Sequence, residues 1–248
     1  MNIILIGTGR MGRLLKECAL DAGDAVVGEY GRANIAELAA APAADVAIDF
    51  SGPEALPDVA AYVARTGTPL VSGTTGYTAE EKAAVAALGE HAPVVWSANY
   101  SLGVAVLARA LRLVTAALRP DFDIEVTETH HNRKKDAPSG TAITLAEGIV
   151  ENLAGKQGWV NLAPGIEHAA NRIERSGEAP ADRIEIRSVR EGAVPGIHTV
   201  TYESEDDVLE IRHTIKNRRT LALGAVVAAE FLCGKQGVYS MDDLLRNA

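Results

Sequence analysis

This sequence of 248 residues has only two cysteines, no long apolar run and no excess of basic residues. The two cysteines, Cys18 and Cys233, each fall within a helical pattern, so we expect buried, reduced thiols and a cytoplasmic protein. No apolar run reaches about 18 residues, so we expect no membrane helix. The formal net charge of −9 argues against nucleic acid and anionic membranes as general partners.

Short apolar segments alternate with helical patterns over the first hundred residues. The first segment leads straight into a glycine loop, so we expect a folded strand there rather than a signal peptide. Apolar strands separated by helices are typical of parallel sheets that are covered on both faces. The sequence therefore predicts an α/β protein with an N-terminal Rossmann-like, doubly wound parallel sheet. The predicted strands are 3–6, 25–30, 46–50, 69–72 and 93–96.

A glycine-rich loop lies between the first predicted strand and the first predicted helix. In this position three glycines permit a tight turn, the close approach of a pyrophosphate and the packing of helix on strand. The pattern predicts a dinucleotide site, and the alternative is a glycine turn with a purely structural role. The loop, which satisfies G-x-G-x-x-G, consists of Gly7, Thr8, Gly9, Arg10, Met11 and Gly12.

The end of the second predicted strand bears on the choice between NADH and NADPH. An acid that binds the adenosine ribose is usual there, but the only acid is Glu29, and the strand ends in Gly31 and Arg32. An arginine in this place suits the 2′-phosphate of NADPH, and the alternative is a solvated loop cation. We expect NADPH to be used at least as well as NADH.

Two further loops follow later strands and would meet the same edge of the sheet, where such folds bind ligands. Gly73, Thr74 and Thr75 can bring backbone and hydroxyl groups to a nicotinamide, and the second loop offers amide and carbonyl groups. Taken alone, each loop is as well explained by ordinary turn chemistry. The second loop consists of Ser97, Ala98, Asn99 and Tyr100.

The remainder of the chain has a different pattern. A long helix over 101–118 is expected to lead into a second domain, and from Asp182 apolar residues alternate with polar ones as in strands. This predicts a smaller α+β domain with a mixed or antiparallel sheet, while 160–181 should form an extended loop. The resulting division is 1–101 with 217–248 for dinucleotide binding, and 102–216 for the second domain.

The run 128–141 stands between a period-2 strand and a helix and gathers reactive side chains. His130 and His131 fall at the end of the strand, and Lys134 follows in the connection. Imidazole and ammonium groups can transfer protons, so the run predicts a site for a small anion that must be protonated. The alternative is a solvated basic loop.

The start of the following helix adds the means to hold that anion. Ser139 or Thr141 is a plausible N-cap, and the backbone N–H groups of Gly140 and Thr141 would lie at the positive end of the helix. A helix N-terminus receives a carboxylate or a phosphate well. We therefore expect these residues to contact an anionic substrate.

The histidines do not predict a metal site. His130 and His131 are adjacent on a strand and point to opposite faces, and no third ligand has a convincing spacing. His198 and His213 are expected to be surface or satisfied structural histidines. We therefore expect no metal.

The run from Glu128 to Thr141 resembles the signature of dihydrodipicolinate reductase, also named 4-hydroxy-tetrahydrodipicolinate reductase, a family of bacterial lysine biosynthesis. The resemblance implies an oxidoreductase that reduces 4-hydroxy-tetrahydrodipicolinate to tetrahydrodipicolinate with NADPH or NADH in the diaminopimelate pathway. Further segments that fall in family order are 7–12, 49–51, 73–76, 97–103 and 191–198.

The resemblance also implies roles for individual residues. His130 would be the acid/base histidine and Lys134 the proton donor, while His131, Gly140 and Thr141 would bind the small dicarboxylate substrate. The glycine loop, 73–75 and 97–100 would bind the cofactor. Family members are usually tetramers joined through the second sheet, which implies a homotetramer in which 102–216 serves substrate binding and oligomerisation.

Some positions depart from the family pattern. Two other functional interpretations also remain. Gly31 replaces an acid that binds the ribose in many members, which leaves the cofactor preference open. Another two-domain NAD(P)-dependent dehydrogenase would share the first half of the chain, and a non-catalytic NAD(P)H sensor would need only the glycine loop. The run 128–141 disfavours both. The departing positions are Gly31, Pro195, Ile197 and Leu223.

Overall fold

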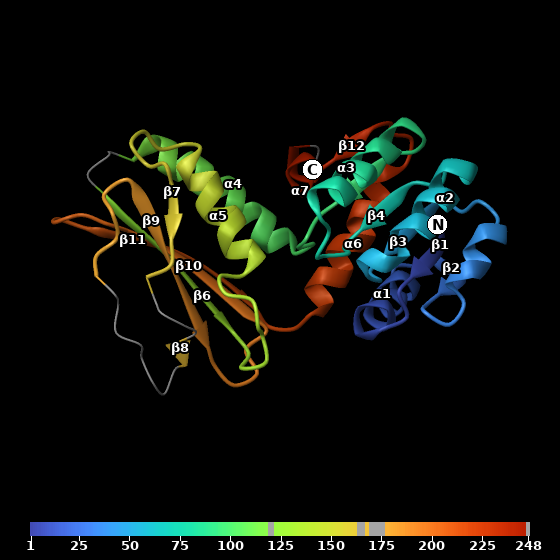
Figure 1. Ribbon diagram of the computed structural model, residues 1–248, viewed down its shortest axis with the longest axis horizontal. Coiled ribbons are helices and arrows are strands. Elements are labelled where there is room, and N and C mark those ends of the chain that lie inside the picture. Colours follow the sequence, from blue (N-terminus) through green and yellow to red (C-terminus); the bar gives the residue numbers. More distant parts are fainter. Residues whose placement is uncertain (119–121, 163–166, 169–176, 247–248) are drawn as a thin grey trace. The chain divides into compact units, whose positions relative to one another are not determined.

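The computed structural model describes residues 1–118, 122–162, 167–168 and 177–246. The protein divides into two compact units; the chain leaves the first after Leu102 and returns to it after Asn217. Each unit has its own sheet, with six strands in its described part (Figure 1). Unit 1 comprises Met1–Leu102 with Arg218–Ala248, and unit 2 comprises Gly103–Asn217.

The sheet of unit 1 is parallel throughout and has the strand order β12-β5-β4-β3-β1-β2. From β1 the sheet extends on one side through β3, β4 and β5 and on the other side to β2. This reversal of strand order confirms the predicted Rossmann-like, doubly wound fold. The strand β12 was not predicted, because two residues show no periodicity. The strands are β1 (Asn2–Ile6), β2 (Ala25–Tyr30), β3 (Val46–Asp49), β4 (Leu70–Ser72), β5 (Val94–Trp96) and β12 (Val238–Tyr239).

Helices cover this sheet and end at recognisable signals. Gly67, with φ +67°, ends α2 in the left-handed conformation, and Thr78 and Glu81 form a capping box at the start of α3. The helix α6 packs against α1 and against β3, β4 and β5. The helices are α1 (Arg10–Asp21), α2 (Leu56–Thr66), α3 (Ala79–Ala87), α6 (Arg219–Leu232) and α7 (Met241–Arg246), with 3₁₀ turns at Ile35–Ala40, Pro53–Ala55 and Leu88–Glu90.

The sheet of unit 2 is mixed, as predicted. The strand β10 is antiparallel to β6 and β11, whereas β9 is parallel to β6, β7 and β8. Two helices, α4 (Leu102–Ala117) and α5 (Gly140–Val150), lie over one face of this sheet (Figure 1). The strands are β6 (Asp123–His130), β7 (Gly158–Val160), β8 (Glu167–His168), β9 (Arg183–Arg190), β10 (Gly196–Glu203) and β11 (Val208–Ile215).

The inward face of the unit 2 sheet changes from apolar to polar along its strands. Ile124 and Val126 of β6 belong to the apolar core, but Glu128 and His130 continue the same face and are also buried. The two neighbouring strands make the same change, which places polar groups side by side at one end of the sheet. On β9 the inward residues are Ile184, Ile186, Ser188 and Arg190, and on β10 they are Tyr202, Val200, His198 and Gly196.

Two expectations need correction. Cys233 is exposed and not buried, because it follows the last turn of α6, whereas Cys18 is buried as expected. The expected loop 160–181 contains the short strand β8, while 163–166 and 169–176 lie outside the described residues. Within the described part of the chain, no helix combines the length and the apolar character needed to cross a membrane.

Candidate active site

The glycine loop of unit 1 joins β1 to α1 in a conformation that needs glycine. Gly7 has a φ of +98°, and a side chain there would overlap the backbone of Phe50. A side chain at Gly12 would overlap the carbonyl of Gly7. At Gly9, by contrast, no atom beyond the glycine and its two chain neighbours lies within 4 Å of the place a Cβ would take. The loop therefore leaves open space at its second glycine, beside the first turn of α1.

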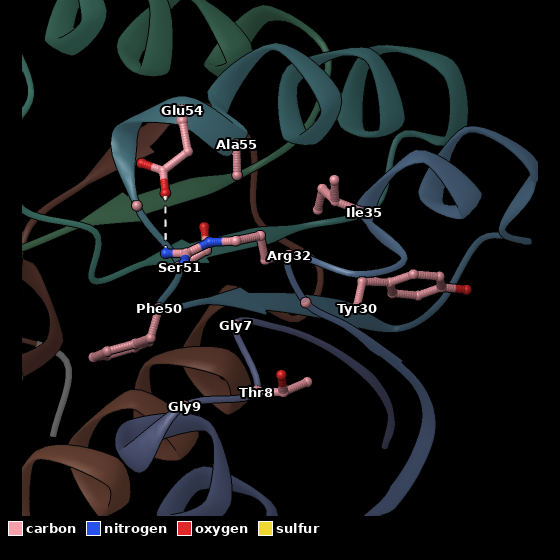
Figure 2. Close-up of a pocket in the computed structure, with 12 residues that line it drawn as sticks. Gly7, Thr8, Gly9, Tyr30, Arg32, Ile35, Phe50, Ser51, Glu54 and Ala55 are labelled. Carbon is pink, nitrogen blue, oxygen red and sulfur yellow. Dashed lines mark ion pairs between the residues drawn. The ribbon is translucent and has the colours of Figure 1, made fainter.

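A pocket of about 360 Å³ opens beside this loop. Arg32, in the loop after β2, pairs with Glu54 of the 3₁₀ turn Pro53–Ala55 (Figure 2). The guanidinium lies 3.9 Å from the carboxylate. The Arg32 side chain is 95% exposed, so this ion pair holds it weakly and leaves it available to a ligand. The lining residues are Gly7, Thr8, Gly9, Tyr30, Gly31, Arg32, Ile35, Phe50, Ser51, Gly52, Glu54 and Ala55.

Asp49, at the end of β3, organises the loops next to the pocket. Its buried carboxylate accepts hydrogen bonds from the hydroxyl groups of Ser51 (2.5 Å), Ser72 (3.1 Å) and Thr74 (2.8 Å). Burial raises the pKa of Asp49, and these hydrogen bonds oppose that rise. The carboxylate thereby ties β3 to the loop after β4. No local pattern in the sequence predicts this role of Asp49.

The loop after β5 uses most of its side chains internally. The Ser97 hydroxyl donates to the carbonyl of Asn99, and the Asn99 side-chain oxygen accepts from the backbone N–H of Ser101. The buried Tyr100 hydroxyl lies 2.8 Å from the carbonyl of Ser72 and 2.9 Å from that of Val95. Ala98 is the exposed residue of this loop, while Ser97 and Asn99 are half-buried.

The structure gathers part of the predicted cofactor set into the pocket. Gly7, Thr8, Gly9 and Arg32 line it together. The remaining residues lie outside its lining, at the carboxyl ends of the parallel strands or in the first turns of α1. Those residues are Arg10, Met11, Gly12, Gly73, Thr74, Thr75, Ser97, Ala98, Asn99 and Tyr100.

In unit 2 the polar end of the sheet centres on Glu128. Its side chain and that of Arg190 are fully buried, and the guanidinium donates to both carboxylate oxygens at 3.1 Å. The carboxylate also contacts Nδ1 of His130. Burial alone would raise the pKa of Glu128, but the bond with His130 and the charge of Arg190 outweigh it, and the pKa is lowered.

The connection from β6 to α5 carries the predicted proton donor. The ammonium of Lys134 donates to the carboxylate of Asp136 at 2.7 Å, and its side chain is 22% exposed. Burial would raise the pKa of Asp136, but Lys134 outweighs that effect and lowers it. Arg190 donates to the backbone carbonyls of Lys134 (3.3 Å) and Asp136 (2.6 Å). One buried guanidinium therefore holds this connection to the sheet.

The helix α5 begins beside the same cluster. Ser139 is its N-cap, because its hydroxyl accepts from the backbone N–H of Ala142 at 3.2 Å. The Ser139 backbone N–H donates to Glu128 at 3.2 Å. Gly140 is exposed, and no atom outside its chain neighbours and its own helix backbone lies within 4 Å of the place a Cβ would take. Thr141 is half-buried. The first turn of α5 is thus held against Glu128 with open space at Gly140.

His198 also belongs to this cluster. From the sequence it was expected to be only a surface or structural histidine. Its ring lies 5.3 Å from that of His130, and its Nε2 lies 3.3 Å from the hydroxyl of Ser139. Burial lowers the pKa of His198 to about 3, and the nearby His130 adds to that effect, so His198 is neutral at physiological pH. The antiparallel register that places His198 opposite Glu128 is a long-range feature, and local periodicity carries no trace of it.

His131 and His213 lie next to members of this cluster in the sequence or in the sheet. His131 is half-buried, and its backbone carbonyl accepts from the N–H of Lys134 at 3.0 Å. His213 is half-buried and lies opposite His198 on β11. Among the residues that the structure describes, no group of three His, Cys, Asp or Glu side chains is arranged to hold a metal ion.

Comparison with known proteins identifies relatives over the full chain. A 4-hydroxy-tetrahydrodipicolinate reductase of Christiangramia forsetii is 38% identical, covering 99% of this chain and 98% of its own length. The protein of the same name from Clostridium tetani is 33% identical, covering 100% of this chain and 98% of its own length. A dipicolinate-bound dihydrodipicolinate reductase from Paenisporosarcina sp. TG-14 is similar in fold, with a TM-score of 0.74, 22% identity and 97% of each chain covered.

The two halves of the chain also match the two parts of one protein family. Residues 1–100 match the dihydrodipicolinate reductase N-terminus, and residues 103–245 match the dihydrodipicolinate reductase C-terminus. The matches meet near the boundary between the two units. The chain therefore belongs to the dihydrodipicolinate reductase family.

Proposed function

We propose that this protein reduces 4-hydroxy-tetrahydrodipicolinate to tetrahydrodipicolinate, with the loss of water, in diaminopimelate and lysine biosynthesis. Family membership over both halves of the chain supports this reaction. The observation that carries the proposal is the run 128–141, where candidate proton donors and a helix N-terminus are held around one buried carboxylate. A dicarboxylate substrate that must be protonated needs this combination of groups.

The cofactor of the reaction is NADPH or NADH, and the residues of unit 1 fit it. The pocket beside the glycine loop and the open space at Gly9 suit a dinucleotide whose pyrophosphate lies at the N-terminus of α1. When bound, the nicotinamide supplies the hydride. Arg32 would contact a 2′-phosphate. The other proposed contacts are Gly7–Gly12, Gly73–Thr75 and Ser97–Tyr100.

The residues of unit 2 would hold and protonate the substrate. One carboxylate of the ring would accept from the backbone of Gly140 and from Thr141 at the start of α5, with His131 beside it. Fixing the ring in this way contributes to the rate through orientation. Addition of hydride leaves the ring in need of a proton, which Lys134 would donate with help from His130.

We propose a different role for each of the two parts of the chain. We assign dinucleotide binding to 1–101 with 217–248, and substrate binding and oligomerisation to 102–216.

A homotetramer is supported by the unit 2 sheet, because in the described residues α4 and α5 cover only one of its faces. Val208 of β11, whose partner Glu203 lies on the outward face, is 58% exposed and would be covered by another subunit. Sedimentation of the purified protein would measure the subunit number.

We place the protein in the cytoplasm. Both cysteines are free thiols, which suits a reducing compartment. Fractionation of the cells that make the protein, with detection by antibody, would test this location. Recovery outside the cytoplasm would contradict it.

The reaction can be tested directly with the purified protein. The measurement is oxidation of NADPH and of NADH, coupled to fresh 4-hydroxy-tetrahydrodipicolinate made by the preceding synthase. We expect turnover with at least one cofactor and stabilisation by pyridine-2,6-dicarboxylate, a planar dicarboxylate, when cofactor is present. A protein that binds cofactor without any turnover would be a sensor or would act on a different substrate.

A further inference from the structure

We infer that Glu128 is a positioning residue that sets His130 directly and Lys134 through Arg190. This inference rests on the proposed function, in which those two residues transfer protons. Glu128 contacts Nδ1 of His130, both ends of the Arg190 fork and the backbone N–H of Ser139. One carboxylate is therefore the common anchor of the strand end, the connection after it and the helix start.

The burial of the ion pair shows why its geometry is strictly set. The side chains of Glu128 and Arg190 have 0% exposure, so water cannot replace a lost partner. A buried charge without its partner is strongly unfavourable, and rotation of either side chain would leave one. The pair thus has one favourable arrangement, and every group bonded to it shares that constraint.

The contact with His130 selects one form of the imidazole. A carboxylate can only accept a hydrogen bond, so Nδ1 of His130 must carry the proton in the contact. The second nitrogen, Nε2, faces Gly196, where an added Cβ would lie 3.2 Å away. In the neutral ring Nε2 is thus the nitrogen that can take up a proton and later deliver it.

The contact with Arg190 extends the control to Lys134. The guanidinium donates to the carbonyls of Lys134 and Asp136 while it is held by Glu128. The carboxylate of Asp136 in turn accepts from the Lys134 ammonium. Both ends of the segment 134–136 are therefore fixed. The Lys134 ammonium is oriented in this way without touching Glu128 itself.

The first test is Glu128→Gln in the full-length protein with cofactor and substrate. The amide keeps the shape and one acceptor oxygen but removes the charge that holds Arg190 and selects the form of His130. We expect kcat to fall roughly 10²-fold, the lower end of an acid–base contribution. The KM for the substrate should stay within about threefold, because Gly140 and Thr141 remain in place.

Glu125→Gln is the matched control. Glu125 lies on the outward side of the same strand and pairs with Arg187 of β9 at 3.8 Å, so the change removes a carboxylate between the same two strands. We expect kcat within about twofold of wild type. A similar loss of kcat in both variants would overturn the inference, since strand pairing alone would then explain the effect.

A second readout needs no turnover. In protein labelled with ¹⁵N-histidine, the His130 signals, assigned from a His130→Asn variant, report which ring nitrogen carries the proton. We expect the Nδ1–H form in wild type and in Glu125→Gln, and a mixture in Glu128→Gln, because an amide can donate as well as accept. A single unchanged form in Glu128→Gln would overturn the role of its carboxylate.

Arg190→Lys separates the effect of Glu128 on His130 from its effect on Lys134. It also provides a test if Glu128→Gln does not fold. An ammonium cannot hold the carboxylate and both carbonyls at once, so kcat should fall while His130 keeps its Nδ1–H form. A kcat within threefold of wild type would contradict the link from Glu128 to Lys134. Absence of turnover in wild type would contradict the proposed function only, because the histidine spectra would still decide the arrangement of His130.

Discussion

At the scale of single residues, the chemistry of unit 2 depends on which charges are buried together. Glu128 and Arg190 are buried as a pair of opposite charges, and His198 is buried beside them in its neutral form. His130 and Lys134 were predicted as site residues from the local run, whereas Glu128 and Arg190 were not given roles. Arg190 lies 62 residues after Glu128, and no local pattern connects them.

Replacing the proposed proton donor tests the residue with the clearest single role. Lys134→Ala should lower kcat by roughly 10²–10⁴-fold, because it removes the ammonium that supplies the proton. Lys135→Ala is the control, since Lys135 is the next residue and is exposed. Steady-state kinetics with saturating cofactor measure both. A kcat within threefold of wild type in Lys134→Ala would exclude that residue as the donor.

Arg32 offers a second test at this scale. Arg32→Ala should raise the KM for NADPH about tenfold and leave the KM for NADH nearly unchanged, because only NADPH carries a 2′-phosphate for the guanidinium. Arg13→Ala, an exposed arginine of α1, is the control. The measurement is the cofactor dependence of turnover. A strong preference for NADH that Arg32→Ala leaves unchanged would contradict the assignment.

At the scale of elements, local signals predicted the helices and strands that carry the site. The strand β2 has the predicted bounds, and Ser139 caps α5 as one of two predicted candidates. The strand β12 was missed because its pairing with β5 supplies the only evidence for it. Elements set by capping and periodicity could be predicted, and elements set by pairing could not.

The start of α5 leads to a prediction about substrate affinity. Thr141→Val should raise the KM for the substrate about tenfold with little change in kcat, since it removes a hydroxyl that would anchor a carboxylate before and during the reaction. Thr144→Val is the control, because the Thr144 hydroxyl donates back to the carbonyl of Gly140 within the helix. Kinetics at varied substrate concentration compare the two. An unchanged KM in Thr141→Val would argue against the anchor.

At the scale of the whole molecule, the two units differ in how their buried groups respond to pH. In unit 2, His198 has a pKa lowered to about 3 by burial, and the pKa of Glu128 is also lowered. Both groups bind more protons in the unfolded chain as pH falls, so acid destabilises this unit. In unit 1, the raised pKa of Asp49 has the opposite sign, because the folded state then binds the proton more readily.

Unit 2 should therefore lose stability as pH falls from about 6.5 toward 3, first through His198 and below about 4.5 also through Glu128. Urea unfolding at several pH values measures this in a Trp96→Phe variant, which leaves Trp159 of unit 2 as the only tryptophan. His198→Asn in the same background should reduce the pH dependence of the free energy of unfolding between pH 6.5 and 4.5. An equal dependence in both proteins would show that His198 is not responsible.

The parallel α/β unit, the glycine loop and the strand–turn–helix of 128–141 could all be predicted from the amino-acid sequence. These features depend on periodicity, on capping and on glycine, all of which act between near neighbours in the chain. The sequence does not predict that Glu128, Arg190 and His198 lie together, because this follows from strand pairing in the folded protein. Their contact requires the parallel register of β6 with β9 and the antiparallel register of β6 with β10, which bring together strands far apart in the sequence.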